Sequence, residues 1–365
     1  MTISETQALI VLNNTPGLGP VKIRHLITHC GTPTAVLQAS ATALEQVPGI
    51  GSRIATAITG WQQSPTWHAD IEAAERMDVE VIPYTDSRYP KRLLTLKDHP
   101  VLLYVAGTLT PADGHSIAVV GTRNATHYGR EMAHQISKDL PRGDFTVISG
   151  LARGIDTAAH RGALDGKGRT IAVIGSGLAK LYPEENAGLA EMITQHGAVI
   201  SEYPMLTPPD RQQFPQRNRI VSGLTLGTLL IEAPTRSGAM ITMDRAETQG
   251  RRLFALPGRV DVETFRGNHL LIKSGRAQLI ENGADIAEAF DSLFTAGQAL
   301  SKPARGLLNE DERKLLELLP SKELPIDDIV NITKLPIMKL NVLLMSLIIK
   351  KQIKEFPGKI YKKTA

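Results

Sequence analysis

The sequence predicts an α/β protein built on a doubly wound, mostly parallel sheet. Three observations support this fold class: six short apolar runs recur in the middle of the chain, helix-forming segments separate them, and the runs do not alternate with polar residues. Strands that are apolar throughout are buried on both faces, and alternation with helices implies right-handed crossovers. The runs are Ile117–Gly121, Phe145–Gly150, Thr170–Gly175, Ala198–Glu202, Thr228–Glu232 and Arg252–Leu256. We therefore predict a Rossmann-like domain over residues 115–295.

A small helical module precedes this domain, over residues 1–80. Two phrases, Thr15–Pro20 and Gln46–Gly51, share a Pro-Gly-apolar-Gly pattern that leads into a helix. The pattern is typical of helix-hairpin-helix modules, because glycine permits the sharp turn. The free N–H groups of the following helix can face a phosphate. Contact with a DNA backbone and simple helix packing both fit, since few basic residues lie nearby.

Residues 81–114 read as a linker and lead-in, rich in proline, with a possible edge strand at Val101–Val105. Within the core domain, helices are expected at 128–140, 156–164 and 186–196. These segments supply the crossovers between successive strands.

The last segment, residues 306–365, predicts a winged helix. Asn309 or Asp311 can cap a first helix, a second begins at Ile326, and a third runs from Pro336 to Lys351. A hairpin turning at Pro357-Gly358 follows. The net charge of the chain is +4, and the basic excess lies in residues 302–365, which contain 13 Lys/Arg and 8 Asp/Glu. The third helix is mostly apolar, which favours a protein partner over a DNA groove.

Composition excludes several classes of protein. The single cysteine, Cys30, rules out an intrachain disulfide and, with no convincing histidine spacing, a structural metal site. No apolar stretch of about 18 residues predicts a membrane span, and no secretory signal is evident, so we expect a cytoplasmic protein without membrane contact. Aromatic residues make up only 4% of the chain, which disfavours binding bases mainly by stacking.

Glycine, serine and arginine concentrate where the predicted strands end. Ligands of open parallel sheets bind at this edge. The loops are Gly121–Asn124, Ser149–Asp156, Gly175–Gly177 and Arg236–Gly238. The sequence contains no G-x-x-x-x-G-K-[ST] loop and no Gly-x-Gly-x-x-Gly fingerprint after the first strand, so a mononucleotide or dinucleotide cofactor is not expected. Several loops with cations or hydroxyls fit a row of phosphates better.

The segment Phe214–Gly223 is the most specific phrase. Arg217 and Arg219 flank Asn218 where an apolar run reaches the surface. Contact with a polyanion is the favoured interpretation, and pairing with neighbouring carboxylates is the alternative.

Candidates for catalysis are weak. Asp156 and His160 lie four residues apart on one predicted helix, a spacing that is more often structural than catalytic. Glu202 and Glu232 end predicted strands. We expect no enzymatic activity and no catalytic residue.

Several ordered motifs together resemble the DNA-processing protein A (DprA/Smf) family. They are Ser149–His160, Phe214–Gly223, Arg236–Asp244, Phe254–Gly258 and Gly267–Gly275. The resemblance implies a protein that binds and protects single-stranded DNA without sequence specificity during natural transformation. It further implies loading of the RecA recombinase onto that strand, and a homodimer joined through the Rossmann-like domains. Some members of the family have a sterile-alpha-motif-like or helix-hairpin-helix N-terminus and a winged-helix C-terminus, and the flanking modules of this chain fit that architecture.

The expected site follows from the glycine loops and from this resemblance. The DNA-binding residues would be Arg123, Ser149, Gly150, Arg153, Gly175, Ser176, Gly177, Lys180, Arg217, Asn218, Arg219, Ser237 and Gly238. Leu271 and Ile272 would contribute to the dimer face. Glu184 stands where some relatives carry lysine, and Lys180 is expected to compensate.

Two other functions remain open. A nucleotide phosphoribohydrolase on the same fold would need a Pro-Gly-Gly-x-Gly-Thr loop before its glutamate, and Leu226–Glu232 lacks the Pro-Gly-Gly. A pure adaptor would use its flanking modules to recruit partners and contact DNA only incidentally.

Overall fold

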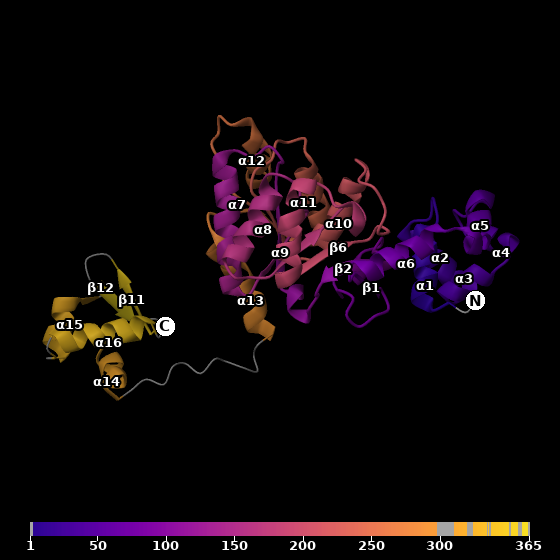
Figure 1. The fold of residues 1–365 in the computed structure, drawn as a ribbon. Coiled ribbons are helices and arrows are strands. Elements are labelled where there is room, and N and C mark those ends of the chain that lie inside the picture. Colours follow the sequence, from indigo (N-terminus) through magenta and orange to yellow (C-terminus); the bar gives the residue numbers. More distant parts are fainter. Residues whose placement is uncertain are drawn as a thin grey trace. The chain divides into compact units, whose positions relative to one another are not determined.

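A computed structural model (Figure 1) describes residues 3–297, 310–319, 324–333, 335, 337–349, 352–356 and 360–363. The chain divides into two compact units, Met1–Ala289 and Phe290–Ala365. Each unit is described by itself.

The first unit contains a nine-stranded sheet in the order β1-β2-β6-β5-β4-β3-β7-β8-β9. All neighbours from β6 to β9 are parallel, whereas β1 and β2 pair antiparallel at one edge. This arrangement confirms the predicted doubly wound, mostly parallel sheet. The strands are β1 (Glu80–Pro83), β2 (Leu102–Gly107), β3 (Ser116–Val120), β4 (Thr146–Ser149), β5 (Thr170–Val173), β6 (Gly197–Ser201), β7 (Gly227–Leu230), β8 (Arg252–Ala255) and β9 (Gln278–Leu279).

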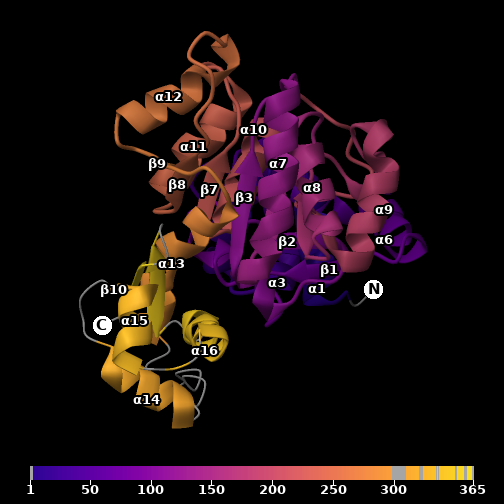
Figure 2. The ribbon, with the colours of Figure 1, turned by 90° about the vertical axis from the view of Figure 1, so that its left-hand side faces the viewer.

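Helices cover both faces of the sheet (Figure 2). One face carries α7 (His127–Asp139), α8 (Ile155–Asp165) and α9 (Ala187–His196). The other carries α10 (Gln213–Gly223), α11 (Gly238–Thr248) and residues 89–96. Successive residues of β3 point to opposite faces, and all five are buried. Burial on both sides explains why the strands are apolar throughout. The α-helix α12 (Arg266–Lys273) follows β8, and α13 (Gly283–Gly297) runs across the division between the two units at Ala289.

The N-terminal module contains both predicted glycine turns. Gly17 (φ +79°) joins α1 to α2, and Gly49 (φ +84°) joins α4 to α5. Each turn lies beside the helix that follows the other turn. Gly17 lies beside Ile54, the third residue of α5, and Gly49 lies beside Lys22, the third residue of α2. The two hairpins therefore pack with approximate twofold symmetry. The helices are α1 (Glu5–Asn14), α2 (Pro20–Cys30), α3 (Pro33–Gln38), α4 (Ala41–Glu45), α5 (Ser52–Thr59) and α6 (Thr66–Arg76).

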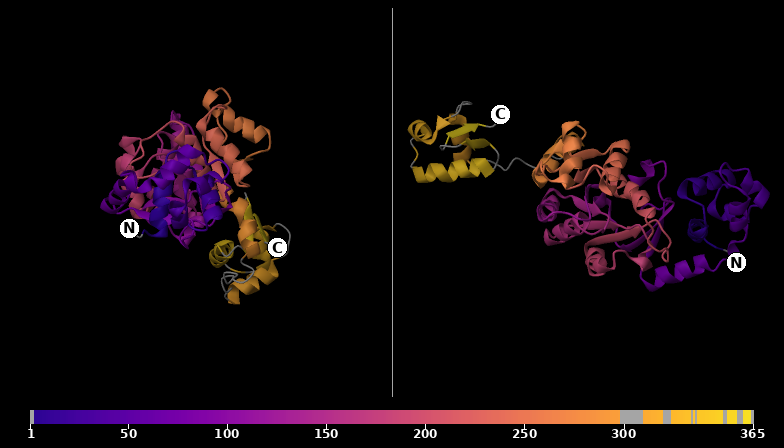
Figure 3. Two further views of the ribbon diagram at one scale, coloured as in Figure 1. Left: turned by 90° about the vertical axis from the view of Figure 1, so that its right-hand side faces the viewer. Right: turned by 90° about the horizontal axis from the view of Figure 1, so that it is seen from above.

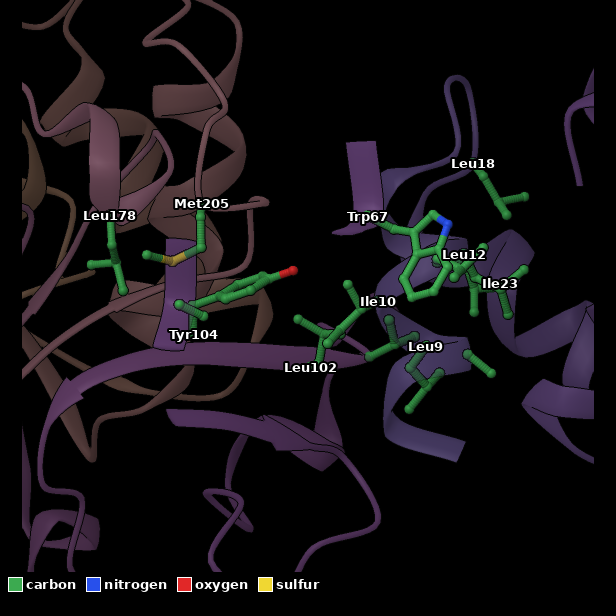
Figure 4. Packing of buried hydrophobic residues seen from close by; sticks show 14 of the residues in the cluster. Leu9, Ile10, Leu12, Leu18, Ile23, Trp67, Leu102, Tyr104, Leu178 and Met205 are labelled. Carbon is green, nitrogen blue, oxygen red and sulfur yellow. The ribbon is translucent and has the colours of Figure 1, made fainter. Parts of the chain in front are cut away.

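The module shares a hydrophobic cluster with the antiparallel edge of the sheet (Figure 4). Asp70 of α6 lies buried in this contact, where its carboxylate accepts hydrogen bonds from Asn14, the hydroxyl of Tyr104 and the backbone N–H of Met205. Burial raises the pKa of Asp70, and these hydrogen bonds oppose the shift. The boundaries proposed from the sequence at residues 80, 114 and 295 remain predictions.

In the second unit (Figure 3), the described residues after α13 form three helices and a three-stranded antiparallel sheet. The strand order is β10-β12-β11. Its elements are α14 (Glu310–Leu318), β10 (Leu324–Pro325), α15 (Ile326–Thr333), α16 (Ile337–Ile349), β11 (Ile353–Phe356) and β12 (Ile360–Lys363). The winged-helix assignment remains a prediction, and Asn309, Pro336 and the turn at Pro357-Gly358 lie outside the described residues. Of all the helices that are described, none combines the length and apolar character needed to cross a membrane.

Candidate nucleic-acid interface

A groove of about 530 Å³ opens at the carboxyl ends of β3, β4 and β7. Here β3 lies between β4 and β7, so successive crossovers depart in opposite directions and leave a crevice, as expected at the switch point of a doubly wound sheet. Loops after β3 and β4 and the helices α10 and α11 form its walls. Polar or charged lining residues are Thr122, Arg123, Asn124, Asp156, Arg211, Arg217, Asn218, Ser237 and Thr242.

The loop after β3 presents Arg123 to this groove. The backbone N–H of Thr122 donates to the carbonyl of Glu232 (2.7 Å), which fixes the start of the loop. The exposed Arg123 side chain then lies over the ring of Phe214, with its guanidinium carbon 5.1 Å from the ring centre. This cation–π contact orients the arginine while leaving its N–H groups available to an anion.

Glu232 holds this loop from below and does not line the groove. Its buried carboxylate accepts hydrogen bonds from the hydroxyl of Thr126 (2.7 Å), the backbone N–H of Thr126 and the hydroxyl of Thr264 (2.5 Å). A carboxylate occupied in this way orders backbone and is not placed to act on a substrate.

The loop after β4 uses its backbone N–H groups internally. Those of Gly150 and Ala152 donate to the carboxylate of Asp156 (3.1 and 3.3 Å). The hydroxyl of Ser149 donates to the carbonyl of Val119 (2.7 Å). Burial raises the pKa of Asp156, and the charge of Arg217 opposes the shift. The loop is therefore a rigid wall, and the predicted backbone contact through Gly150 meets an N–H group that is already bonded.

Arg217 crosses beneath this wall and reaches the groove from α10. Its Nη1 donates to the carbonyls of Gly150 (2.7 Å) and Val173, and its Nε donates to Asn218 Oδ1 (3.1 Å). Nη2 has no hydrogen bond among the described residues and lies 2.5 Å from where a Cβ of Gly150 would be, so a side chain at position 150 would displace the guanidinium. Burial lowers the pKa of Arg217 to about 10, with Asp156 opposing the shift and Arg123 adding to it. The guanidinium therefore remains charged at neutral pH.

Arg219 does not belong to the groove, which corrects the expectation that both arginines flank one strand. Its guanidinium pairs with Glu202 and lies 3.4 Å from Asp98. Burial raises the pKa of Glu202, and Arg219 opposes the shift. For Arg219 the alternative interpretation, pairing with neighbouring carboxylates, is the one the structure supports.

The loop after β5 does not line the groove either. Gly175, Ser176 and Gly177 are buried. A Cβ on Gly177 would lie 2.2 Å from the carbonyl oxygens of Pro204 and Met205, and its N–H donates to Thr207. These glycines permit close packing of the chain, and a DNA contact through them remains a prediction.

A small recess beside the groove contains Arg153. This arginine forms two hydrogen bonds of 2.8 Å with Glu185, so its charge is already paired. Lys180 and Glu184 are exposed nearby and line neither the groove nor the recess. Compensation of Glu184 by Lys180 remains a prediction.

The start of α11 forms the opposite wall. Ser237 caps the helix by accepting a hydrogen bond from the N–H of Met240 (3.3 Å). Gly238 follows as the first helical residue, and a Cβ there would meet nothing within 4 Å. The positive end of the helix dipole therefore lies at an open part of the groove, where it favours an anion.

Sequence reasoning missed Arg211. It is exposed, lines the groove, and has no ion pair or hydrogen bond within the described residues. Its position three residues before Phe214 was the available signal. With Arg123 and Arg217 it gives the groove three arginines.

The acid–base pair considered for catalysis is not assembled. His160 is fully buried, and its Nδ1 lies 2.7 Å from the hydroxyl of Thr170. Burial and then the charge of Arg217 lower its pKa to about 3. Asp156 bonds to the β4 loop, so the two side chains serve separate structural roles.

The predicted dimer residues need a correction. Leu271 is fully buried in the core, so it is not an exposed apolar residue, and Ile272 is partly buried against the same cluster. Leu270 is the neighbouring apolar side chain that reaches solvent, at 48% exposure. A dimer face near α12 remains a prediction.

Another motif residue, Asn268, also acts structurally. It accepts from the N–H of Ala233 (3.0 Å) and donates to the carbonyls of Ile231 and Leu256 (2.9 Å each). It thereby joins the ends of β7 and β8.

Comparison with known proteins supports the resemblance. Protein Smf of Synechocystis is 30% identical over the full length of both chains. Protein Smf of Escherichia coli is 41% identical over 59% of this chain and 57% of its own. The crystal structure of DNA processing protein A from Streptococcus pneumoniae matches with a TM-score of 0.69 at 32% identity, covering 80% of this chain and 99% of that one.

A second solved structure concerns the single-stranded DNA binding mode of DNA processing protein A from Helicobacter pylori. It matches with a TM-score of 0.53 at 28% identity, covering 60% of this chain and 97% of that one. The profile described as DNA recombination-mediator protein A matches residues 80–291, which include every wall of the groove. The chain therefore belongs to the DNA recombination-mediator protein A family.

Proposed function

We propose that the groove binds single-stranded DNA through its phosphates, without sequence specificity, and so protects the strand. The observation that carries this proposal is the convergence of Arg123, Arg211 and Arg217 with the start of α11 at one edge of the sheet. A relative of known structure binds single-stranded DNA. Within the groove only Asp156 carries a negative charge, and its carboxylate is bonded to the β4 loop.

The three arginines would contribute to DNA binding in different ways. Arg217 is held by Gly150 and Val173, so it offers a fixed cation that loses little entropy on binding. Arg123 and Arg211 are exposed and can follow a flexible backbone. Phosphate contacts fix position and carry no sequence information, so binding should tolerate any sequence and weaken steeply with salt.

The role of the chain beyond DNA binding is inferred from its family. We propose that the chain acts in the cytoplasm as a homodimer and loads the RecA recombinase onto the bound strand. Two grooves on one strand would raise the avidity through effective concentration, without any new contact.

We propose that this role involves no catalysis. A phosphoribohydrolase would need the glutamate at the end of β7 to reach its substrate. Glu232, at that position, is fully buried and bonded to Thr126 and Thr264. This observation disfavours the enzymatic alternative.

The test is anisotropy of a labelled oligonucleotide, single- or double-stranded, across a salt titration. Wild type should prefer the single strand, and Arg123→Ala should bind less tightly with a shallower dependence on salt. Arg161→Ala is the matched control, because Arg161 is an exposed arginine of α8 outside the groove. Duplex binding that equals single-strand binding and ignores Arg123→Ala would refute the proposal.

A further inference from the structure

A second cavity, of about 600 Å³, lies near the amino ends of β3 and β7. It opens between residues 87–92 and 109–114, and the groove lies at the carboxyl ends of the same strands. Ile148, Ile171 and Leu224 give it an apolar floor. Its size falls in the range of about 300–1,000 Å³ that is typical of small-molecule sites.

The rim of this cavity carries cations that no acidic residue neutralises. Arg92 donates from Nη2 to the carbonyl of Gly114 (3.3 Å), and its buried Nε has no partner among the described residues. Lys91 is exposed, with no hydrogen bond or ion pair in the part of the chain that is described. Both side chains line the cavity.

A third cation, Arg251, lies close enough to sense Arg92. Burial and then the charge of Arg92 lower the pKa of Arg251 to about 10. Its Nη2 donates to the carbonyl of Gly223 (3.0 Å), and its buried Nε also has no partner among the described residues. Arg251 does not line the cavity, but its charge and that of Arg92 repel each other, and neither guanidinium forms an ion pair with a carboxylate among the described residues.

The other charges at the rim are already occupied. Asp113, the one acidic residue of the lining, accepts two hydrogen bonds from Arg169 (2.8 and 2.9 Å). Arg88 pairs with Glu80 and Asp86. Partly buried positive charge without a counter-charge is costly, so an anion from outside would be favoured here.

We propose that this cavity binds a small organic phosphate of about nucleotide size. Arg92 and Lys91 would hold the phosphate, because a guanidinium suits its oxygens, and the apolar floor would take the planar or apolar body. The site is independent of the groove, so the inference goes beyond the proposed function. A free mononucleotide and the terminal nucleotide of a DNA strand share this chemistry.

Calorimetric titration of the full chain with deoxyadenosine monophosphate tests the proposal, with inorganic phosphate as the probe that lacks an apolar body. The nucleotide should bind at least tenfold more tightly than phosphate. Arg92→Gln should weaken nucleotide binding at least tenfold. Gly114→Leu should abolish it, because Gly114 lines the cavity and a Cβ there meets nothing within 4 Å.

Two controls separate this site from the groove. Arg123→Ala should keep nucleotide affinity within twofold while weakening the binding of single-stranded DNA. Gly114→Leu should abolish nucleotide binding while leaving the affinity for single-stranded DNA within twofold. In the Arg123→Ala background, tighter binding of a 5′-phosphorylated than a 5′-hydroxyl oligonucleotide would identify a strand end as the source, and equal weak binding would identify free nucleotide.

Three outcomes would overturn the proposal. They are no nucleotide binding at millimolar concentration, unchanged binding in a Gly114→Leu variant with wild-type melting, and loss of nucleotide binding in Arg123→Ala. The last would place the nucleotide in the groove. Failure of the proposed function would appear separately, as single-stranded DNA binding that ignores Arg123→Ala.

Discussion

The loops after β3 and β5 look alike in sequence and differ in the structure. Both follow a buried strand and contain glycine with a polar neighbour. The first, at Gly121–Asn124, lines an open groove, whereas the second, at Gly175–Gly177, is packed beneath the chain at Pro204–Thr207. A glycine at a strand end thus permits the close approach of either a ligand or another part of the chain. The difference depends on what the fold brings against it.

Glycine-to-alanine substitutions offer the largest test of this comparison. Gly177→Ala places a Cβ 2.2 Å from two backbone carbonyls, which cannot move as a side-chain end can. We expect a loss of roughly 3 kcal/mol in the free energy of unfolding, as for other overpacked sites. Urea unfolding measures it.

Gly238→Ala is the matched control, since its Cβ meets nothing within 4 Å at the start of α11. Stability there should be unchanged or rise by up to about 1 kcal/mol, because alanine favours the helix. Equal losses at both positions would show that the two glycines do not differ in the way described.

Arg217 and Arg219 offer a similar comparison on one helix, because Arg217 lines the groove and Arg219 packs against another part of the chain. Arg217→Ala should weaken binding of single-stranded DNA by about 1–3 kcal/mol, or roughly 5- to 150-fold, because it removes a cation of the groove. Arg219→Ala should leave the affinity of the folded protein within about threefold, yet cost roughly 3 kcal/mol of stability, since Glu202 loses its partner. Both arginines are buried, so both variants should lose stability, and anisotropy well below the melting temperature separates the two, with urea unfolding to show that each variant is folded. Similar losses of DNA affinity in the two variants would show that Arg219 also contributes to the DNA site.

The burial of His160 on α8 can be tested by the pH dependence of stability. The folded-state pKa of His160 is about 3, below the unfolded value of about 6.5. As pH falls below about 6.5, His160 is protonated in the unfolded chain but not in the folded chain. The free energy of unfolding therefore falls by about 1.4 kcal/mol per pH unit, down to about pH 3. Urea unfolding at pH 7, 6 and 5 should show the wild type losing its advantage over His160→Gln. A difference that stays constant with pH would mean that folding does not lower the pKa of His160.

The smallest expected effect concerns Arg211. Arg211→Gln should reduce the slope of log affinity against log salt by about 1, because one phosphate contact releases about one counterion. Arg161→Gln, at an exposed arginine outside the groove, should leave the slope unchanged. An unchanged slope in Arg211→Gln would remove Arg211 from the interface.

Local patterns predicted the sheet well because its strands bury both faces. The six expected runs correspond to β3–β8, and the strand expected at Val101–Val105 corresponds to β2, which is covered at the sheet edge by β1. The two outermost strands, β1 and β9, were not predicted, because their runs are short or weakly apolar. The groove edge was predictable as well, since it follows from parallel strand order. Arg123 and Arg217, which were expected at this edge, line the groove, and their contact with DNA remains a prediction.

The misplaced residues share a physical cause. Whether Arg219 meets Glu202 or solvent, and whether Leu271 or Leu270 faces outward, depends on tertiary contacts between segments far apart in sequence. Arg211 was overlooked for the converse reason. It lies in an irregular segment with no periodic pattern, and the fold alone brings it to the groove.

The buried carboxylate of Asp70 has a consequence for shortened chains. A chain that began at residue 80, the boundary suggested by the sequence, would keep Tyr104 and Met205 but lose the acceptor for both of their hydrogen bonds. The antiparallel sheet edge would also expose Leu102 and Tyr104, which are now covered by the N-terminal helices (Figure 4). Such a truncation would leave an uncovered apolar sheet face, a feature that favours aggregation. A soluble fragment should therefore start before α1.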